Sequence, residues 1–184
     1  MSSGRKGQFF IIGAVLICSL LYFGLSPSVT VSVPEGRTAG FLADNIANEL
    51  PYALNLGING SGGTETLANF TAFAMNAASE TGMQPHVAWV VISPSGSALN
   101  VSFGNFYSST ATAEVNISGS YKAIYAGDSS VNSTLFSAGG YTYTAWLSVP
   151  GGSVTFEAPA NKTTLYAVVS LDYGEAIARK EILA

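Results

Sequence analysis

The stretch HVAWVVISPSGSALNVSF, from His86 to Phe103, decides the fold. Its first eight residues form a continuous apolar run of strand length, which is typical of a central β-strand. PSGS then supplies a turn, and ALNVSF alternates apolar and polar side chains as a half-buried strand does. The stretch therefore predicts two strands joined by a turn, with the first in the middle of a sheet.

The chain after Phe103 keeps this period of two. Further strands are expected at 111–118, 121–126, 141–149, 153–158, 164–173 and 176–183. The sequence PGG at 150–152 separates two of them tightly enough for a hairpin. Seven or eight short strands separated by turns predict an antiparallel β-sandwich or open barrel over residues 86–184.

Two short amphipathic helices are expected before the strands, within residues 26–85. In the first helix, from Arg37, apolar residues recur at helical spacing, and Pro51 should end or kink it. The second runs from Thr64 to Thr81, with Gly82 in the C-terminal capping position. The apolar stripes of the two helices are Phe41, Leu42, Ile46 and Leu50 in the first, and Leu67, Phe70, Phe73, Ala74, Ala77 and Ala78 in the second. Ahead of them, SVTVSV predicts a short strand and 34–36 a turn.

An uncharged apolar run from Phe9 to Leu25 precedes this region and follows Arg5 and Lys6. Seventeen helical residues of ~1.5 Å each span ~25 Å, close to the hydrocarbon thickness of a bilayer. The basic residues on the near side place the N-terminus in the cytoplasm and the main domain outside the cell. The sequence therefore predicts a single-pass protein with residues 8–25 in the membrane and an extracellular main domain.

The order Arg5-Lys6-Gly7-Gln8, followed directly by apolar residues, resembles the class III signal peptide of archaeal type IV pilin-like proteins. The resemblance covers about the first twenty-five residues. It implies that a prepilin-type peptidase cuts between Gly7 and Gln8, so that residues 1–7 are a removable basic leader. It also implies that the apolar helix stays on the mature chain and associates with the helices of other subunits.

Two positions depart from the pilin pattern. The fifth residue after the implied cut is Ile12, where many pilins carry a glutamate that pairs with a neighbour's terminal amine. Pro27 ends the helix just beyond membrane length, because the residue before a proline is pushed out of the helical region. Both departures favour an anchored protein or a minor subunit over the main subunit of a filament.

The composition narrows the range of functions. Charged residues make up 10% of the 184 residues and the net charge is −4, with no basic stripe, which argues against nucleic acid as a partner. The one cysteine, Cys18, lies in the apolar run, so no disulfide can hold the exterior domain together. A surface so poor in charge must be wetted by neutral polar groups, or covered by sugars or by neighbouring subunits.

Six N-x-S/T sequons follow the apolar run, where about two are expected by chance from the asparagine, serine and threonine content. They begin at Asn59, Asn69, Asn100, Asn116, Asn132 and Asn161. Strand alternation puts Asn100 and Asn116 on the face opposite the apolar one, from which a glycan can project into solvent. We expect an N-glycosylated surface protein.

No catalytic, cofactor or metal site is predicted. The chain has a single histidine, His86, and no nucleophile elbow or phosphate loop, so the sequence is not expected to be an enzyme. Tyr141 and Tyr143 should share one strand face, opposite Trp146. Exposed tyrosines would form a platform for stacking sugars, whereas buried ones would belong to the core.

These observations predict a structural, pilin-like subunit of an archaeal surface filament or adhesive assembly, which self-associates or joins related subunits. The alternative is a membrane-anchored β-sandwich that binds a glycan or a peptide. An anchored hydrolase ranks last, because it would require clustered acidic side chains.

Overall fold

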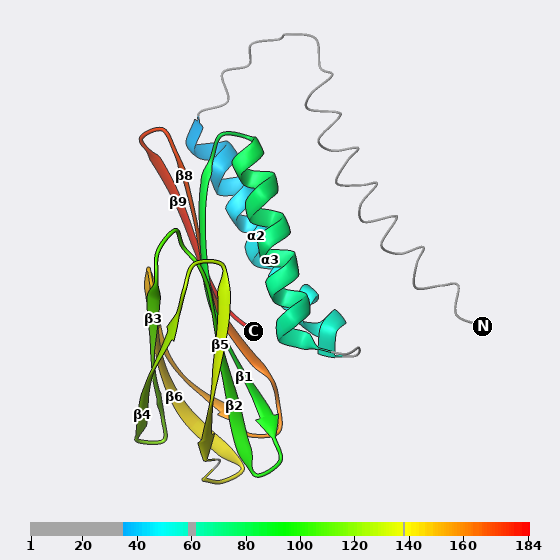
Figure 1. The fold of residues 1–184 in the computed structure, drawn as a ribbon, viewed down its shortest axis with the longest axis vertical. Coiled ribbons are helices and arrows are strands. Elements are labelled where there is room, and N and C mark those ends of the chain that lie inside the picture. Colours follow the sequence, from blue (N-terminus) through cyan, green and yellow to red (C-terminus); the bar gives the residue numbers. More distant parts are fainter. Residues whose placement is uncertain (1–34, 59–61, 138) are drawn as a thin grey trace, which may run out of the picture. The chain divides into compact units, whose positions relative to one another are not determined.

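The apolar run at His86 lies in β1 (Gln84–Ser95), at the centre of a five-stranded antiparallel sheet (Figure 1). The protein is seen in a computed structural model that describes residues 35–58, 62–137 and 139–184. The strand order of this sheet is β5-β2-β1-β8-β9. Its other strands are β2 (Ala98–Phe106), β5 (Ser130–Ser137), β8 (Thr164–Tyr173) and β9 (Ala176–Leu183).

A four-stranded antiparallel sheet packs against one face of the five-stranded sheet, so the β region is a sandwich. Its order is β4-β3-β6-β7. The strands are β3 (Ala111–Ile117), β4 (Ser120–Ala126), β6 (Thr142–Val149) and β7 (Gly152–Pro159). Of the two expected architectures, an antiparallel sandwich or an open barrel, the two packed sheets match the sandwich.

Two helices, α2 (Glu35–Ile58) and α3 (Gly63–Glu80), cover the opposite face of the five-stranded sheet (Figure 1). β1 is therefore buried on both faces, which explains its unbroken apolar sequence. Its odd-numbered apolar residues, such as Trp89, contact the helices, and its even-numbered ones, such as Val90, contact the four-stranded sheet.

The C-terminus of α3 follows the sequence expectation closely. Thr81 is the cap, and Gly82 adopts a left-handed φ of 80°. The amide of Met83 donates to the carbonyl of Ala78, which satisfies a helix-end acceptor in the manner of a Schellman motif. Glycine suits position 82 because it adopts a positive φ without steric cost.

Pro51 was expected to end or kink the first helix, and the first alternative is excluded because α2 continues to Ile58. Two details of the helices were predicted wrongly. Glu35 belongs to α2 and not to a turn. Phe41 and Phe73 are exposed, because the buried stripes consist mainly of small residues. Ala39, Ala43, Ala47, Ala74 and Ala78 are all buried there. Alanine lets a helix approach its neighbours closely, and the bulky phenylalanines are left on the outer side.

β5 was not predicted. Its sequence, SVNSTLFS, is mostly polar, and Phe136 is its single buried residue. The strand forms at the edge of the sheet, where β2 supplies the backbone partners. An edge strand with little buried surface leaves little periodicity for sequence reasoning to detect.

Several predicted features lie outside the described residues: the leader 1–7, the apolar run 8–25, the short strand at 28–33, the processing pair Gly7-Gln8, and Asn59. Within the described ranges, neither helix has the length and apolar character needed to cross a membrane. Residues Pro34–Ala184 form one compact unit, so the helices and strands on either side of position 85 share a core.

Candidate functional sites: sequon asparagines and an aromatic sheet face

Five of the six sequon asparagines lie in the described part of the chain. Asn69 on α3, Asn132 on β5 and Asn161 in the β7–β8 connection are exposed. Asn100 on β2 and Asn116 on β3 are partly buried. The hydrogen bonds and neighbours of these asparagines differ from one sequon to the next.

Thr71, the third residue of the Asn69 sequon, has a hydroxyl group that forms hydrogen bonds inside the core. Thr71 is fully buried, and its Oγ1 donates to the carbonyl of Leu67 at 2.7 Å. The same oxygen accepts a hydrogen bond of 3.2 Å from Nε1 of Trp89. A buried indole N–H requires an acceptor. This requirement accounts for Thr71 independently of glycosylation.

The sequon at Asn100 also takes part in local hydrogen bonding. Asn100 does lie opposite the apolar face of β2, as expected, but that side of the sheet faces the helical layer and the side chain is partly buried. Its Nδ2 donates to Oγ of Ser102 at 3.4 Å. Ser102 is buried and lies 2.9 Å from Oγ of Ser133 on β5. A glycan here would start within this small network.

Asn132 helps to join the two sheets where β4 and β5 lie side by side. Its Nδ2 donates to the carbonyl of Tyr125 on β4 at 2.9 Å. From the other sheet, Lys122 donates to the carbonyl of Leu135 and lies over the ring of Phe136. The nitrogen of Asn132 that would carry a sugar is therefore already engaged in a contact between the sheets.

Asn116 lies on the outer face of the four-stranded sheet, opposite the buried residues Val115 and Ile117. Its direct cross-strand partners are Tyr121 on β4 and Trp146 on β6. Its Oδ1 accepts a 3.0 Å hydrogen bond from the amide of Gly119 in the β3–β4 turn. The alternation argument thus correctly placed Asn116 on a face turned away from the core.

The aromatic residues divide differently from the expectation. Tyr143 is buried at 3% exposure, whereas Tyr141 lies before β6 begins and is 97% exposed. The two tyrosines therefore form no joint platform. Tyr121, Tyr125 and Trp146 are exposed on the outer face of the four-stranded sheet instead. Sequence reasoning missed this group because it depends on which strands pair.

A polar cluster lies at one end of the contact between the sheets. The phenol of Tyr166 donates to Oε2 of Glu181 at 2.9 Å, and Arg179 donates to Oε1 of the same carboxylate at 2.6 Å. Burial raises the pKa of Tyr166, and the hydrogen bond to Glu181 raises it further. The phenol of Tyr107 donates to the carbonyl of Pro150. The Tyr166–Glu181 bond joins the paired strands β8 and β9, and the Tyr107–Pro150 bond joins the residue after β2 to the β6–β7 turn.

His86 stacks on Tyr107, with ring centroids 5.0 Å apart, and its Nε2 lies 3.9 Å from a carboxylate oxygen of Asp172. Its Nδ1 is buried without a hydrogen-bond partner. Among the described residues, no three acidic, histidine or cysteine side chains gather as a metal site would require. The cluster has the features of packing at a sheet end.

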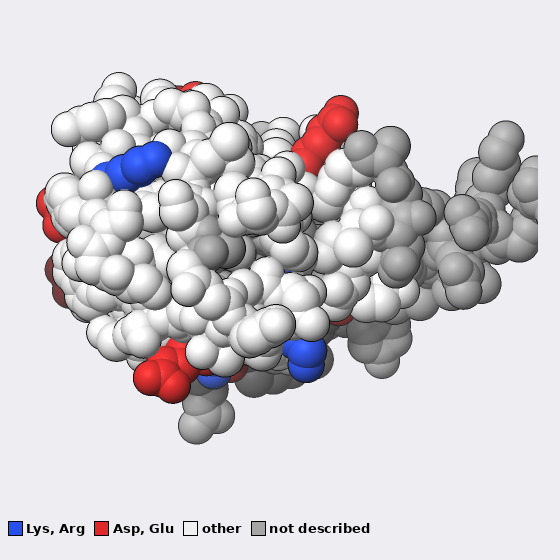
Figure 2. Space-filling view, turned by 90° about the horizontal axis from the view of Figure 1, so that it is seen from below, with Lys and Arg blue, Asp and Glu red and all other residues white. Residues whose placement is uncertain are grey.

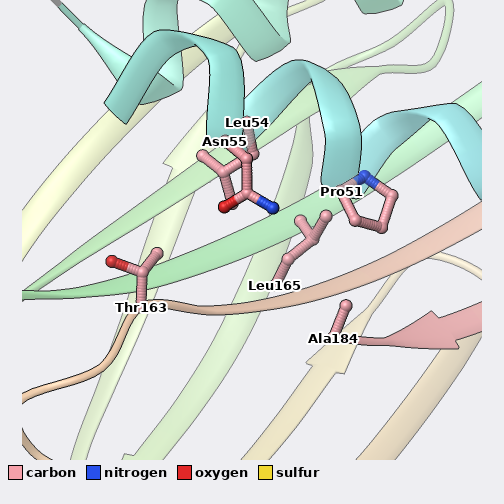
Figure 3. A pocket seen from close by; sticks show the side chains of 6 residues that line it. All are labelled: Pro51, Leu54, Asn55, Thr163, Leu165 and Ala184. Atoms are coloured by element: carbon pink, nitrogen blue, oxygen red, sulfur yellow. The ribbon is translucent and has the colours of Figure 1, made fainter. Parts of the chain in front are cut away.

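One end of the molecule shows little concentrated charge among its described residues. Figure 2 views the end of the molecule that lies at the bottom of Figure 1, and its charged side chains are scattered singly among neutral ones. A depression between α2 and the start of β8 has a largely aliphatic lining, as Figure 3 shows. It is lined by Pro51, Leu54, Asn55, Thr163, Leu165 and Ala184. No charged side chain belongs to this lining.

No protein-family model and no curated protein matches the chain. Function must therefore be argued from the residues themselves.

Proposed function

We propose that this protein is an exported structural subunit of a pilin-like or adhesive surface assembly, glycosylated on its outer domain. The observation that carries the proposal is the order of residues at the N-terminus, with Arg5 and Lys6, then Gly7-Gln8, then an uninterrupted apolar run to Leu25. A prepilin-type peptidase would cut at Gly7-Gln8. The apolar helix would remain to anchor the chain or to pack with other subunits.

The outer domain adds physical support for self-association. Phe41 on α2 and Phe73 on α3 are exposed, although the helical layer already buries an apolar stripe against the sheet. Exposed apolar side chains favour contact with another protein surface where they form one contiguous patch, and we propose that these two phenylalanines contribute to such a patch. In this proposal a second copy covers the phenylalanines.

The test starts with the protein isolated from its native membrane and from sheared surface material. N-terminal sequencing should find a chain that starts at Gln8, and electron microscopy of the sheared fraction should show a polymer that contains it. Replacing Gly7 with valine should leave the leader attached and abolish recovery in that fraction. Replacing Gly4, in the same leader, should change neither result.

Two outcomes would contradict the proposal. A chain that keeps Met1 or Ser2 in the mature protein would indicate a plain signal anchor. A chain that starts near Val29 would indicate a secreted protein without an assembly helix.

The second candidate is an anchored binding module for a glycan or peptide. It draws support from the exposed aromatic side chains of Tyr121, Tyr125 and Trp146 on one sheet face. Such a module should leave the membrane with detergent as a monomer or small oligomer, and it should bind soluble oligosaccharides. Recovery only as a polymer, without measurable binding, would exclude it.

A further inference from the structure

The outer face of the four-stranded sheet holds a row of four residues, one from each strand. In spatial order they are Tyr121, Asn116, Trp146 and Thr155. Tyr121 is 55% exposed and Trp146 is 37% exposed. A sequon asparagine therefore lies directly between two exposed aromatic side chains.

The spacing of this row suits a sugar ring. Directly opposed residues on antiparallel strands have Cβ atoms about 4.5–5.5 Å apart, which is close to the width of a pyranose. The hydrogen bond from Gly119 holds Oδ1 of Asn116 toward the turn, so Nδ2 of the same planar amide points away from Gly119. The faces of aromatic rings favour contact with the C–H groups of a sugar.

We propose that Asn116 carries an N-linked glycan whose first sugar rings lie over the outer face of the four-stranded sheet, against Tyr121 and Trp146. This inference rests on the proposed glycosylation of the outer domain. In the attachment step, an activated glycosyl diphosphate donor loses the bond between its anomeric carbon and the diphosphate oxygen. A new bond joins that carbon to Nδ2, and the amide releases one proton.

The other described sequons fit this role less well. Nδ2 of Asn132 donates to a backbone carbonyl, and the hydroxyl of the Asn69 sequon serves Trp89. Asn100 has Ser93 and Leu135 as its cross-strand partners. Asn161 lies in a connection between strands. Asn116 is the described sequon asparagine that two exposed aromatic residues flank on paired strands.

A covalently attached glycan is favoured over a free one as the occupant of this face. Stacking on exposed rings is weak, and two aromatic side chains alone would hold a free sugar poorly. A covalent bond to Asn116 makes stacking more favourable, because a short link holds the sugar near the rings at an effective concentration in the millimolar range. A glycan already bonded to Asn116 would therefore cover the rings before a free sugar could.

The test uses the full-length protein isolated from its native host. Glycopeptide mass spectrometry should find sugar on Asn116. Iodide quenching of tryptophan fluorescence then reports Trp146, because Trp89 is fully buried. Asn116→Gln should raise the quenching constant about two-fold, if the sugar covers about half of the exposed indole. Asn161→Gln, which removes a sequon in an exposed turn, should leave it unchanged.

A second variant separates loss of the sugar from loss of the asparagine. Ser118→Gly removes the sequon, keeps Asn116, and suits the left-handed φ of 49° at this position. It should raise the quenching constant as Asn116→Gln does. Sugar on Asn116 without a change in quenching would overturn the stacking arrangement and leave the proposed function standing. A bare Asn116 beside other occupied sequons would overturn this inference alone, and sugar on none of them would also end the glycosylation part of the proposed function.

Discussion

Trp89 depends on two residues that are distant from it in the sequence. Its indole lies against Gly104, its direct partner on β2, and its N–H donates to Thr71 on α3. A Cβ atom at position 104 would overlap the six-membered ring of the indole. Trp89, the largest fully buried side chain, therefore has room only because position 104 is a glycine, and its N–H is satisfied by the hydroxyl of Thr71.

Gly104→Ala should destabilise the protein, because the added methyl group forces either Trp89 or β2 to move. Overpacking of this kind costs about 1–3 kcal/mol of the free energy of unfolding. Urea denaturation followed by tryptophan fluorescence measures the change. Gly40→Ala is the control, since no atom lies within 4 Å of its added Cβ. That helix substitution should stabilise by up to about 1 kcal/mol, and equal effects at the two positions would contradict the packing argument.

Thr71→Val should lower the free energy of unfolding by about 1–3 kcal/mol, because it keeps the shape of the side chain but leaves the indole N–H without its acceptor. Thr71→Ser should retain most of the stability. Asn69→Gln removes the same sequon without touching Trp89 and should change the free energy by less than about 0.5 kcal/mol. If Asn69→Gln were as damaging as Thr71→Val, the sequon and not the hydrogen bond would explain Thr71.

At the scale of elements, α2 is held to the sheet by apolar burial more than by charge. Leu50 is fully buried in the core that the helices share with β1 and β8. The ion pair between Lys180 on β9 and Asp44 on α2 measures 2.8 Å, but both side chains are about half exposed. Exposed ion pairs contribute little, because water and salt screen them.

Leu50→Ala should therefore cost about 2–5 kcal/mol of unfolding free energy through lost burial and a residual cavity. Asp44→Asn, on the same helix, should cost less than about 1 kcal/mol. Thermal or urea denaturation measures both changes. If Asp44→Asn lowered the free energy of unfolding by more than about 1 kcal/mol, and if added salt abolished the difference between this variant and the wild type, charge would be shown to hold α2 in place.

The hydrogen bond between Tyr166 on β8 and Glu181 on β9 makes stability depend on pH in the alkaline range. Burial and the Glu181 carboxylate raise the pKa of Tyr166 in the folded state. In the unfolded chain the pKa of this phenol is about 10. The stabilisation is therefore complete at pH values below this pKa and is lost as the pH rises toward the folded-state pKa.

Urea midpoints measured across the alkaline range should fall above about pH 10. Tyr166→Phe, which cannot ionise, should show a smaller fall over the same range. An identical slope in the variant would assign the pH dependence to other groups, among which Tyr107 and Tyr143 also have raised pKa values through burial.

At the scale of the whole domain, the described residues from Glu35 to Ala184 form a three-layer unit in which the five-stranded sheet is covered on both faces (Figure 1). Without the helices, Val87, Trp89 and Val91 would lose their cover and present an apolar face to water. The helices therefore complete the fold of the sandwich and do more than connect it to the N-terminal segment.

A fragment of residues 34–184 should unfold in one cooperative transition, because it contains every layer of the core. A fragment of residues 84–184 retains the nine strands of the described part of the chain but should aggregate or remain unfolded. Circular dichroism and size-exclusion chromatography distinguish the two results. A monomeric, cooperatively folded shorter fragment would show that the helices are dispensable.

The sequence alone determined the features that depend on local pattern. The unbroken run of β1 and the glycine cap of α3 follow from period and backbone preference, and both are present. In β2, Leu99, Val101 and Phe103 share one face as expected, but the strand is not half-buried, because most of its residues are buried on both faces. The predicted membrane helix and processing site rest on residues 5–25 and stay predictions.

Tertiary structure decided what depends on partners that are distant in the sequence. β5 forms because β2 offers it a free edge, and Phe41 and Phe73 remain outside because alanines allow closer packing. Asn116 meets Tyr121 and Trp146 through pairing of three strands, and that pairing depends on how the complete hydrophobic core packs. No local pattern around Asn116 contains that information, because burial is shared among elements while periodicity describes one element at a time.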